Sequence, residues 1–344
     1  MLYIIQTTGQ CNLSCKYCGG SFESHTVPWE VTYSIEKLAK LVKPSDVICF
    51  YGGEPLLNHD FIREVMESVP AVYVIQTNGT LTQKLEEKYW HRFDAVLLSV
   101  DGIREVTDYY RGKGIYDQVM QSRSFLKGKT RDLVARMALS ERGNVYRDVT
   151  HLLPLFDHVH WQLDVLWSDR WKDFEGWASH YKKGIEKLAE FWLSSMKKGK
   201  ILGIAPFQGI IRTEYGMENK KPPCGAGVDA VSILPNGSVL SCPIAVREKW
   251  AILGTIDSFK PQCGIGEPCL SCSYLKKCGG RCLYAYREKY WGKEGFTQIC
   301  EITKHTVDVL LKIKPKIDEL LANGTIRKED LIYPTYNNSV EIIP

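Results

Sequence analysis

The sequence predicts an α/β fold in which six strand–helix units form an open, partial barrel, followed by a smaller cysteine-rich domain. Three observations support this prediction. Short apolar segments alternate with helical patterns in the first half of the chain, and Cys, Gly and Pro become more frequent after Gly203. In addition, ten of the twelve cysteines fall into two tight groups. Six units are too few to close an eight-stranded barrel.

The expected strands are short, rich in Val, Ile and Leu, and mostly followed by polar loops. They are Tyr3–Thr7, Val47–Tyr51, Ala71–Gln76, Ala95–Val100, Leu133–Leu139 and Val159–Val165. The helices expected between them are Thr32–Val42, Asp60–Val69, Thr82–Trp90, Tyr116–Leu126 and Tyr146–Leu155. Near-continuous apolar strands are typical of a parallel sheet covered by helices. In such folds the chemistry lies at the C-terminal ends of the strands.

The second half of the chain is expected to be organised differently. A long helix is predicted from Trp177 to Lys198, and an amphipathic helix from Ile302 to Leu321, because apolar residues recur there at helical spacing. The change in composition places a domain boundary within Lys200–Ala226. We therefore expect a partial barrel over residues 1–212, a cysteine-rich domain over 213–310, and a helix end with an extended tail over 311–344.

Composition limits the classes of function. The 344 residues carry a net charge of only +4 and no long run of like charges, so no nucleic-acid partner is expected. No apolar run reaches the roughly 18 residues of a membrane span, and the N-terminus does not read as a signal peptide. We expect a cytoplasmic protein, in which clustered cysteines indicate metal ligands rather than disulfides.

The first cysteine group lies in the loop directly after the first strand. Cys11, Cys15 and Cys18 have the spacing C-x3-C-x2-C. Three thiolates can bind three irons of a [4Fe–4S] cluster and leave the fourth iron open for a ligand. The spacing alone also allows a zinc site, or a structural cluster, whose fourth ligand lies elsewhere.

Polar motifs end the next three strands, and an arginine lies inside the fifth. They are Gly52-Gly53-Glu54-Pro55, Thr77-Asn78-Gly79, Ser99-Val100-Asp101-Gly102 and Arg136. Two glycines would let the backbone approach a ligand closely, and Glu54 would accept a hydrogen bond from an ammonium group. A tight strand–helix turn would explain the same glycines. A buried arginine requires a partner of its own.

With Tyr17 directly before Cys18, the cysteine motif resembles the signature of the radical S-adenosylmethionine (SAM) superfamily. The resemblance implies a partial (βα)6 TIM-like barrel in which Cys11, Cys15 and Cys18 hold a SAM-binding [4Fe–4S] cluster. In that family SAM is cleaved to a 5′-deoxyadenosyl radical, which abstracts a hydrogen atom. The resemblance also implies that the glycine-rich motif with Glu54 binds the SAM amino group. The further SAM-site residues that it implies are Tyr17, Thr77, Asn78, Ser99 at the ribose, Asp101, and Arg136 at the carboxylate.

The sixth strand is expected to place His160, Gln162 and Asp164 on one face, since side chains alternate along a strand. Polar side chains on a central strand require partners, so this face is expected to line the cavity near SAM or the substrate. Capping of neighbouring backbone groups is the alternative. Arg111 is a further candidate, for which a solvated loop arginine is the alternative.

The second cysteine group has the pattern C-x12-G-x4-C, then C-x2-C-x5-C-x3-C, and a last cysteine. Its members are Cys224, Cys242, Cys269, Cys272, Cys278, Cys282 and Cys300. C-x2-C pairs also occur in zinc sites. The whole pattern is similar to the SPASM extension of radical SAM enzymes, which holds two auxiliary [4Fe–4S] clusters.

That similarity implies Cys224, Cys242 and Cys282 as ligands of the first auxiliary cluster, and the other four cysteines as ligands of the second. Two fully ligated clusters need eight ligands, and the motif supplies seven. Cys263 is either the eighth ligand or a free cysteine. Cys49 is expected to be a small buried apolar residue.

These resemblances together imply a radical SAM oxidoreductase with three [4Fe–4S] clusters and SAM as cofactors. The expected substrate is a ribosomally made precursor peptide, matured by a cross-link or another oxidative modification. The expected electron donor is a reductant such as ferredoxin or flavodoxin. Because the chain starts at the first strand, a leader peptide is expected to bind the barrel, the C-terminal tail or a partner.

Two other functions stay open. A formylglycine-forming enzyme of the sulfatase-maturase type carries an Asp after the cysteine of the G-x4-C motif, where this chain has Pro243. The third candidate is a non-catalytic iron–sulfur electron carrier or a zinc protein.

Overall fold

The computed structural model describes residues 1–165, 168–219, 221–262 and 264–332. These residues divide into two compact units that alternate along the chain. Unit 1 comprises Met1–Val100, Thr107–Val134 and Gly225–Gly264. Unit 2 comprises Asp101–Val106, Ala135–Cys224 and the chain from Ile265 onward. The division into three domains, residues 1–212, 213–310 and 311–344, stays a prediction. The end of the expected tail lies outside the described residues.

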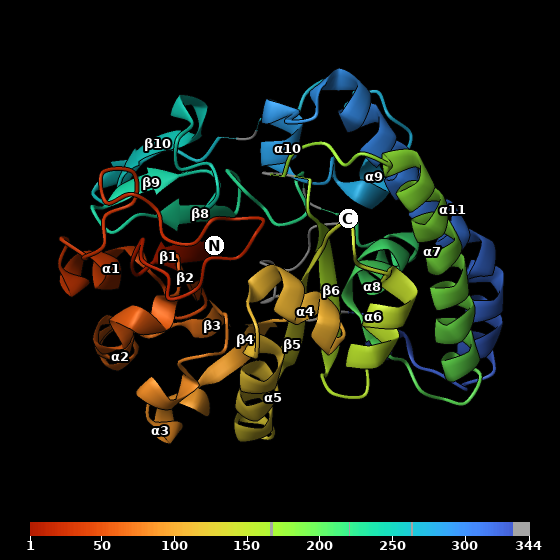
Figure 1. Ribbon diagram of the computed structural model, residues 1–344, viewed down its shortest axis with the longest axis horizontal. Helices are drawn as coiled ribbons and strands as arrows, with labels where there is room; N and C mark the ends of the chain where they lie inside the picture. Colours follow the sequence, from red (N-terminus) through yellow and green to blue (C-terminus); the bar gives the residue numbers. More distant parts are fainter. Residues whose placement is uncertain (166–167, 220, 263, 333–344) are drawn as a thin grey trace. The chain divides into compact units, whose positions relative to one another are not determined.

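Unit 1 is built on a sheet with the strand order β11-β10-β9-β8-β1-β2-β3-β4. Its parallel strands are β1 (Leu2–Gln6), β2 (Val47–Tyr51), β3 (Val72–Thr77), β4 (Phe93–Ser99) and β8 (Ala230–Ile233). The antiparallel strands are β9 (Ser238–Leu240), β10 (Ile252–Thr255) and β11 (Ser258–Phe259). The helices are α1 (Ile35–Leu41), α2 (His59–Ser68), α3 (Glu87–Trp90) and α5 (Ile115–Leu126), with short 3-10 helices η1 (Pro55–Asn58), η2 (Thr82–Lys84) and η4 (Lys249–Ala251). Figure 1 shows β1 to α3 in colours from red to orange, α5 in dark yellow, and β8, β9 and β10 in teal.

The centre of this sheet is apolar on both faces. Ile5, Phe50, Ile75 and Leu97, one from each of four neighbouring strands, are all fully buried. Cys49 precedes Phe50 in β2 and is buried on the opposite face of the sheet, where it pairs with Ile4 in the register of β1 and β2. Burial on both faces explains why the strands read as near-continuous apolar runs in the sequence.

Unit 2 carries the strands β5, β6 (His158–Leu163) and β7 (Gly203–Ile204) in that order; β5 (Leu133–Leu139) begins in unit 1. Its helices are α6 (Val145–Leu152), α7 (Phe174–Met196), α8 (Ala205–Ile211), α9 (Leu275–Cys278), α10 (Leu283–Glu288) and α11 (Gly292–Ala322), with the 3-10 helices η3 (Arg212–Tyr215) and η5 (Lys328–Leu331). The helix α4 (Arg104–Arg111) crosses from unit 2 into unit 1. The long helices α7 and α11 run side by side (Figure 1).

The predicted α/β fold with parallel strands is confirmed, two predicted helices need correction, and one helix is additional. The segment Thr82–Trp90 forms two short helices, η2 and α3, rather than one. The helix expected at Ile302 already begins at Gly292. Helix α4 was not predicted. Among the described residues, no helix has both the length and the apolar character to span a membrane.

Candidate functional site

The loop that carries the first cysteine group is bound to the end of β2 by backbone hydrogen bonds. The N–H of Gly53 donates to Thr8 O over 3.0 Å, and the N–H of Glu54 donates to Gln10 O over 2.7 Å. A Cβ atom on Gly53 would overlap the carbonyl oxygen of Gln10 and lie 2.5 Å from its carbonyl carbon. Gly52 has φ +141°, and a Cβ there would overlap the carbonyl oxygen of Thr8.

This contact changes the interpretation of the two glycines. The group that approaches them closely is the backbone just before Cys11, which is a stronger reason for glycine than a ligand alone. Of the rest of the motif, Pro55 begins the short helix η1 and its carbonyl accepts a hydrogen bond from Thr7. The glycine-rich turn therefore positions the cysteine loop.

Glu54 joins the ends of β2 and β3. Its carboxylate is fully buried and accepts hydrogen bonds from Thr77 Oγ1 (2.6 Å), the N–H of Asn78 (2.7 Å) and the N–H of Leu56 (3.1 Å). Burial raises the pKa of this carboxyl to about 7, against the opposing effect of the three hydrogen bonds. A carboxylate offers about four acceptor positions, so contact with an ammonium group stays a prediction beside this anchoring role.

Asn78 links the turn after β3 to the cysteine loop. Its Nδ2 donates to Asn12 Oδ1 over 2.9 Å and lies 3.9 Å from Cys11 Sγ. Asn12 in turn donates to Thr80 Oγ1 over 2.8 Å. The structure thus brings the predicted residues Cys11, Glu54, Thr77 and Asn78 together in unit 1.

The three thiols of the loop differ in acidity. The pKa of Cys18 is lowered to about 6, chiefly by a hydrogen bond from the Cys15 thiol and also by the N–H of Gly20 and the charge of Arg111. Burial raises the pKa of Cys11. Thiolates are the form that binds metal, and Cys11 and Cys18 are close enough to influence one another electrostatically. The loop therefore holds the three thiols close to one another, as ligation of one shared cluster requires.

Helix α4 supplies residues that the sequence had suggested only weakly. Tyr110 O accepts a hydrogen bond from the N–H of Lys16 over 2.9 Å, and the rings of Tyr110 and Tyr17 are 5.9 Å apart. Arg111 is 9% exposed, and its guanidinium carbon lies 5.5 Å from the centre of the Tyr17 ring. Arg111 is therefore a buried neighbour of the cysteine loop rather than a solvated loop residue.

In unit 2, Arg136 on β5 contacts two residues of β6. Arg136 Nη1 lies 2.9 Å from His160 Nδ1, and Nη2 donates to Gln162 Oε1 over 2.6 Å. His160 is fully buried, whereas Arg136 is only partly buried. The predicted polar face of β6 exists, with Arg136 as its partner, while the expected contact of Arg136 with the SAM carboxylate stays a prediction.

Asp164 and Asp101 accept hydrogen bonds from hydroxyl and backbone N–H groups of unit 2. Asp164 accepts hydrogen bonds from Ser140 Oγ (2.9 Å) and Ser168 Oγ (2.7 Å), and burial raises its pKa. Asp101 is fully buried and accepts from the N–H of Ala138 over 2.9 Å. Ser99 is buried at the end of β4. These contacts give both aspartates a structural role and leave their predicted roles in SAM or substrate binding as predictions.

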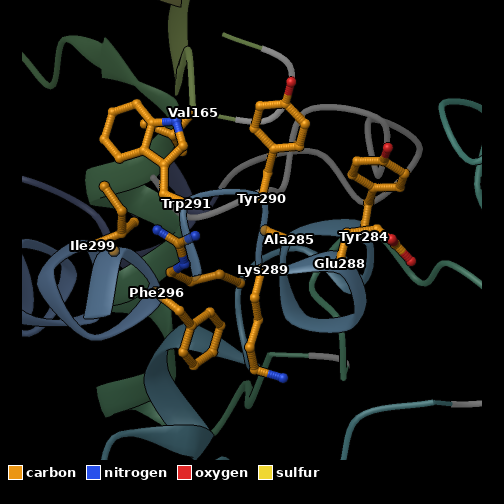
Figure 2. Close-up of a pocket in the computed structure, with 11 residues that line it drawn as sticks. Val165, Tyr284, Ala285, Glu288, Lys289, Tyr290, Trp291, Phe296 and Ile299 are labelled. Carbon is orange, nitrogen blue, oxygen red and sulfur yellow. The ribbon is translucent and has the colours of Figure 1, made fainter. Parts of the chain in front are cut away.

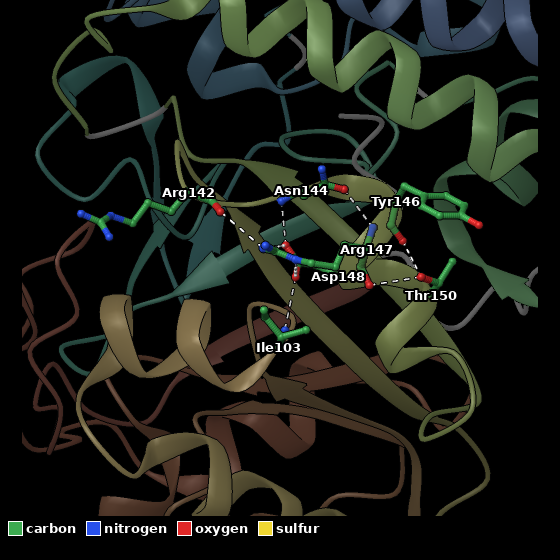
Figure 3. A network of polar contacts seen from close by, with 7 residues as sticks. All are labelled: Ile103, Arg142, Asn144, Tyr146, Arg147, Asp148 and Thr150. Carbon is green, nitrogen blue, oxygen red and sulfur yellow. Dashed lines mark hydrogen bonds and ion pairs between the residues drawn. The ribbon is translucent and has the colours of Figure 1, made fainter.

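The residues after Asp101 belong to a network that the sequence did not suggest (Figure 3). Asp148 accepts hydrogen bonds from the N–H of Asn144 (2.7 Å), the N–H of Ile103 (3.3 Å) and Arg147 Nε (2.9 Å). A Cβ atom on Gly102, whose φ is +117°, would overlap the side chain of Asp148. The network fixes the turn after β4 against the start of α6.

Four cysteines of the second group line one pocket of unit 2. They are Cys269, Cys272, Cys278 and Cys300, and Tyr274, Arg281, Phe296, Thr303 and Lys304 also line it. Burial raises the pKa of Cys269 to about 11, and the charges of the other three thiols add to this effect. Four thiols around one pocket are the donor set that a fully ligated [4Fe–4S] cluster requires.

The other predicted ligands are divided between the units. Cys242 is buried in unit 1, where Gln6 Nε2 donates to the carbonyl of the following Pro243 over 2.9 Å. Cys224 and the buried Cys282, which precedes α10, belong to unit 2. Cys263 lies outside the described residues. The ligand set of the first auxiliary cluster therefore stays a prediction.

A second pocket of unit 2, shown in Figure 2, shares Arg281 and Phe296 with the four-cysteine pocket. Its walls are mainly aromatic and apolar, with Tyr284, Trp291, Phe296 and Ile299 among them. Arg281 lines both pockets. One cationic side chain thus lies at the boundary between an aromatic pocket and the cysteine site.

The comparison with protein families agrees with this site. Residues 5–132 match the profile of the radical SAM superfamily, the part of the chain that holds the cysteine loop, Glu54 and Asn78. These residues therefore form a radical SAM domain, as the cysteine motif predicts. A [4Fe–4S] cluster and SAM are the cofactors that this superfamily implies.

Relatives and solved structures cover more of the chain. An uncharacterised protein of Archaeoglobus fulgidus is 26% identical over 360 residues, which span 94% of this chain and 82% of that protein. The pre-heme d1 synthase of Dinoroseobacter shibae is 28% identical over 160 residues, 44% of this chain and 39% of the synthase.

Two solved structures share the fold at low sequence identity. The structure of anSMEcpe with bound AdoMet matches 95% of this chain and 100% of that chain, with a TM-score of 0.75 and 18% identity. SuiB of Streptococcus suis, bound to the precursor peptide SuiA, matches 84% of this chain and 73% of SuiB, with a TM-score of 0.56 and 13% identity. At these identities the likeness concerns the fold alone.

Proposed function

We propose that the chain is a radical SAM/SPASM enzyme that abstracts hydrogen from a peptide substrate and so matures a ribosomally made peptide. The observation that carries this proposal is the gathering of Cys269, Cys272, Cys278 and Cys300 around one pocket, in a chain that begins with a radical SAM domain. An electron carrier needs no SAM site, and a radical SAM domain alone needs no second cysteine group.

The peptide class of substrate rests on the solved structures with the same fold. One structure of anSMEcpe contains AdoMet and the Cp18Cys peptide, with a TM-score of 0.70, and SuiB is bound to the precursor peptide SuiA. We infer a peptide or protein substrate for this chain as well, with a small redox protein such as ferredoxin or flavodoxin as the electron donor.

In this proposal Cys11, Cys15 and Cys18 hold the SAM-binding cluster, which supplies the electron that cleaves SAM reductively and so starts hydrogen abstraction. The residues around the loop position it. Asn78 donates toward the Cys11 sulfur, and the charge of Arg111 favours the thiolate of Cys18. Arg136 presents its guanidinium from the polar face of β5 and β6, where it binds the SAM carboxylate.

The four-cysteine pocket holds one auxiliary [4Fe–4S] cluster, and Cys224, Cys242 and Cys282 hold another, which makes three clusters with the SAM-binding one. The test is anaerobic incubation of the iron-loaded chain with SAM, dithionite and a candidate peptide from a neighbouring reading frame. We expect 5′-deoxyadenosine and a peptide lighter by two hydrogen atoms, as a cross-link or oxidation produces.

Variants separate the two cysteine sites. Cys11→Ala should lose both 5′-deoxyadenosine and modified peptide. Cys269→Ala/Cys272→Ala should keep SAM cleavage but lose modified peptide, because the two sites lie in different units. Cys49→Ala, which changes a buried cysteine outside both groups, should keep both products. Full modification of the peptide by the Cys269→Ala/Cys272→Ala variant would contradict the role of the auxiliary site.

Formylglycine formation is the second candidate. It draws on the likeness in fold to anSMEcpe, but Pro243 follows Cys242 where a carboxylate base is expected. The same mass measurement distinguishes the two for a candidate peptide that contains Cys but no Ser, since conversion of Cys to formylglycine replaces its sulfur with oxygen whereas a cross-link retains the sulfur.

A further inference from the structure

Arg281 lies at the wall of the four-cysteine pocket, between two of the predicted ligands in the sequence. Its N–H donates to Cys278 O over 2.9 Å, and Cys282 is the next residue. The backbone has φ +59°, a left-handed conformation that few non-glycine residues adopt. This turn directs the side chain into the interior, where Arg281 is 7% exposed and Nη1 lies 3.4 Å from Thr303 Oγ1.

The charge of Arg281 lacks a carboxylate partner in the part of the chain that the structure describes. No ion pair with an Asp or Glu of residues 1–165, 168–219, 221–262 or 264–332 involves it, and its hydrogen bond is to a neutral hydroxyl. A buried guanidinium without a counter-charge destabilises a folded protein by roughly several kcal/mol. The groups that could compensate it are the thiolates that line the same pocket.

Predicted cluster ligands surround Arg281. Cys278 and Cys282 lie on either side of it in the sequence. Cys269, Cys272, Cys278 and Cys300 line the same pocket as its buried side chain. The guanidinium is thus placed to stabilise negative charge on the whole site.

We propose that Arg281 is a positioning residue that supplies the counter-charge of the four-cysteine site and raises the reduction potential of the auxiliary cluster held there. The inference rests on the proposed function, because it requires that cluster. Reduction adds one negative charge to the cluster, and a fixed buried cation stabilises the reduced form more than the oxidised form. Net charge and hydrogen bonds around the sulfurs are known determinants of such potentials.

Lys304 provides an internal comparison. It lines the same pocket but is only partly buried, and its ammonium group lies 5.5 Å from the centre of the Tyr274 ring. Solvent and salt screen a partly exposed charge more than a buried one. Lys304→Gln should therefore shift the potential in the same direction as Arg281→Gln, but by less.

The experiment is an anaerobic redox titration of the iron-loaded full chain, followed by electron paramagnetic resonance. The signal that disappears in Cys269→Ala/Cys272→Ala identifies the cluster in the four-cysteine pocket. For Arg281→Gln we expect a roughly tenfold fall in the equilibrium constant for reduction of this cluster, which is about 59 mV for one electron. Arg281→Lys retains the charge and should stay close to wild type.

Arg170→Gln is the matched surface control, because Arg170 is exposed and pairs with Glu294 in the same unit. An unchanged potential in a fully loaded Arg281→Gln variant would overturn the inference. If Arg281→Gln fails to load the cluster while Arg281→Lys loads it, the requirement for charge is supported. If both fail, Arg281 has a structural role and the inference is wrong. A wild-type chain without sulfide at this site would instead contradict the proposed function, and the iron and sulfide content shows this before any titration.

Discussion

The contact between the glycine-rich turn and the cysteine loop can be tested with Gly53→Ala. The added Cβ would overlap the Gln10 carbonyl oxygen and lie 2.5 Å from the Gln10 carbonyl carbon and 2.9 Å from Gly9 O. All three are backbone atoms, so no side-chain rotation can relieve the overlap. The cysteine loop must move away from β2.

The loss of stability in Gly53→Ala can be worked out from the hydrogen bonds that this movement breaks. The hydrogen bonds from Gly53 to Thr8 and from Glu54 to Gln10 contribute about 0.5–1.5 kcal/mol each. Overpacking adds about 1–3 kcal/mol. We expect the free energy of unfolding of the metal-free chain to fall by roughly 2–6 kcal/mol. We also expect the iron-loaded chain to bind SAM at least about tenfold more weakly, which is about 1.4 kcal/mol.

Urea denaturation and calorimetric SAM titration measure the two effects. Gly128→Ala is the control, because Gly128 has φ +78° but no atom within 4 Å of the position of the added Cβ. It should lose about 1–3 kcal/mol through backbone strain and leave SAM affinity unchanged. If Gly53→Ala behaves like Gly128→Ala in both assays, the glycine-rich turn does not position the cysteine loop.

Three further predictions concern the charged groups. The pKa of Glu54 is raised from 4.5 to about 7, so between these pH values the folded chain holds a proton that the unfolded chain has lost. The free energy of unfolding should therefore fall as pH rises through this window, and this dependence should weaken in Glu54→Gln; an unchanged slope would contradict it. Arg136→Met removes the contacts with His160 and Gln162 and should weaken SAM binding about tenfold or more, whereas equal affinity by calorimetry would exclude Arg136 from the SAM site. Asp148→Ala leaves two backbone N–H groups and Arg147 without their acceptor and should lower the free energy of unfolding by about 1.5–3 kcal/mol in urea denaturation; a loss below about 0.5 kcal/mol would show that the network is not stabilising.

The strands could be predicted from the sequence because burial on both faces leaves a simple apolar signal. All six predicted strands are present: Val47–Tyr51 and Leu133–Leu139 match outright, and the other four differ from the prediction by one or two residues at each end. Helix α4 could not be predicted in this way, because Arg104–Arg111 is largely polar. Its contacts with the cysteine loop, such as Lys16 N–H to Tyr110 O, join segments distant in the sequence.

The candidate site also contains some features that are local in the sequence and others that depend on distant contacts. The cysteine spacings are local, so the sequence identifies both groups, and the structure places Cys269, Cys272, Cys278 and Cys300 around one pocket. The surroundings of Glu54 are not local, since its partners come from the next strand. The motif that contains Glu54 is predicted to bind SAM, whereas the contacts that the structure shows for Glu54 are with other residues of the chain.

The most direct test of the central claim is the iron and sulfide content of the anaerobically purified chain, measured together with SAM cleavage under dithionite. Three clusters correspond to about twelve irons and twelve sulfides per chain, with reductive formation of 5′-deoxyadenosine. The Cys269→Ala/Cys272→Ala variant should retain about eight of each and still cleave SAM. Zinc without sulfide, or iron and sulfide without any cleavage of SAM, would contradict the account.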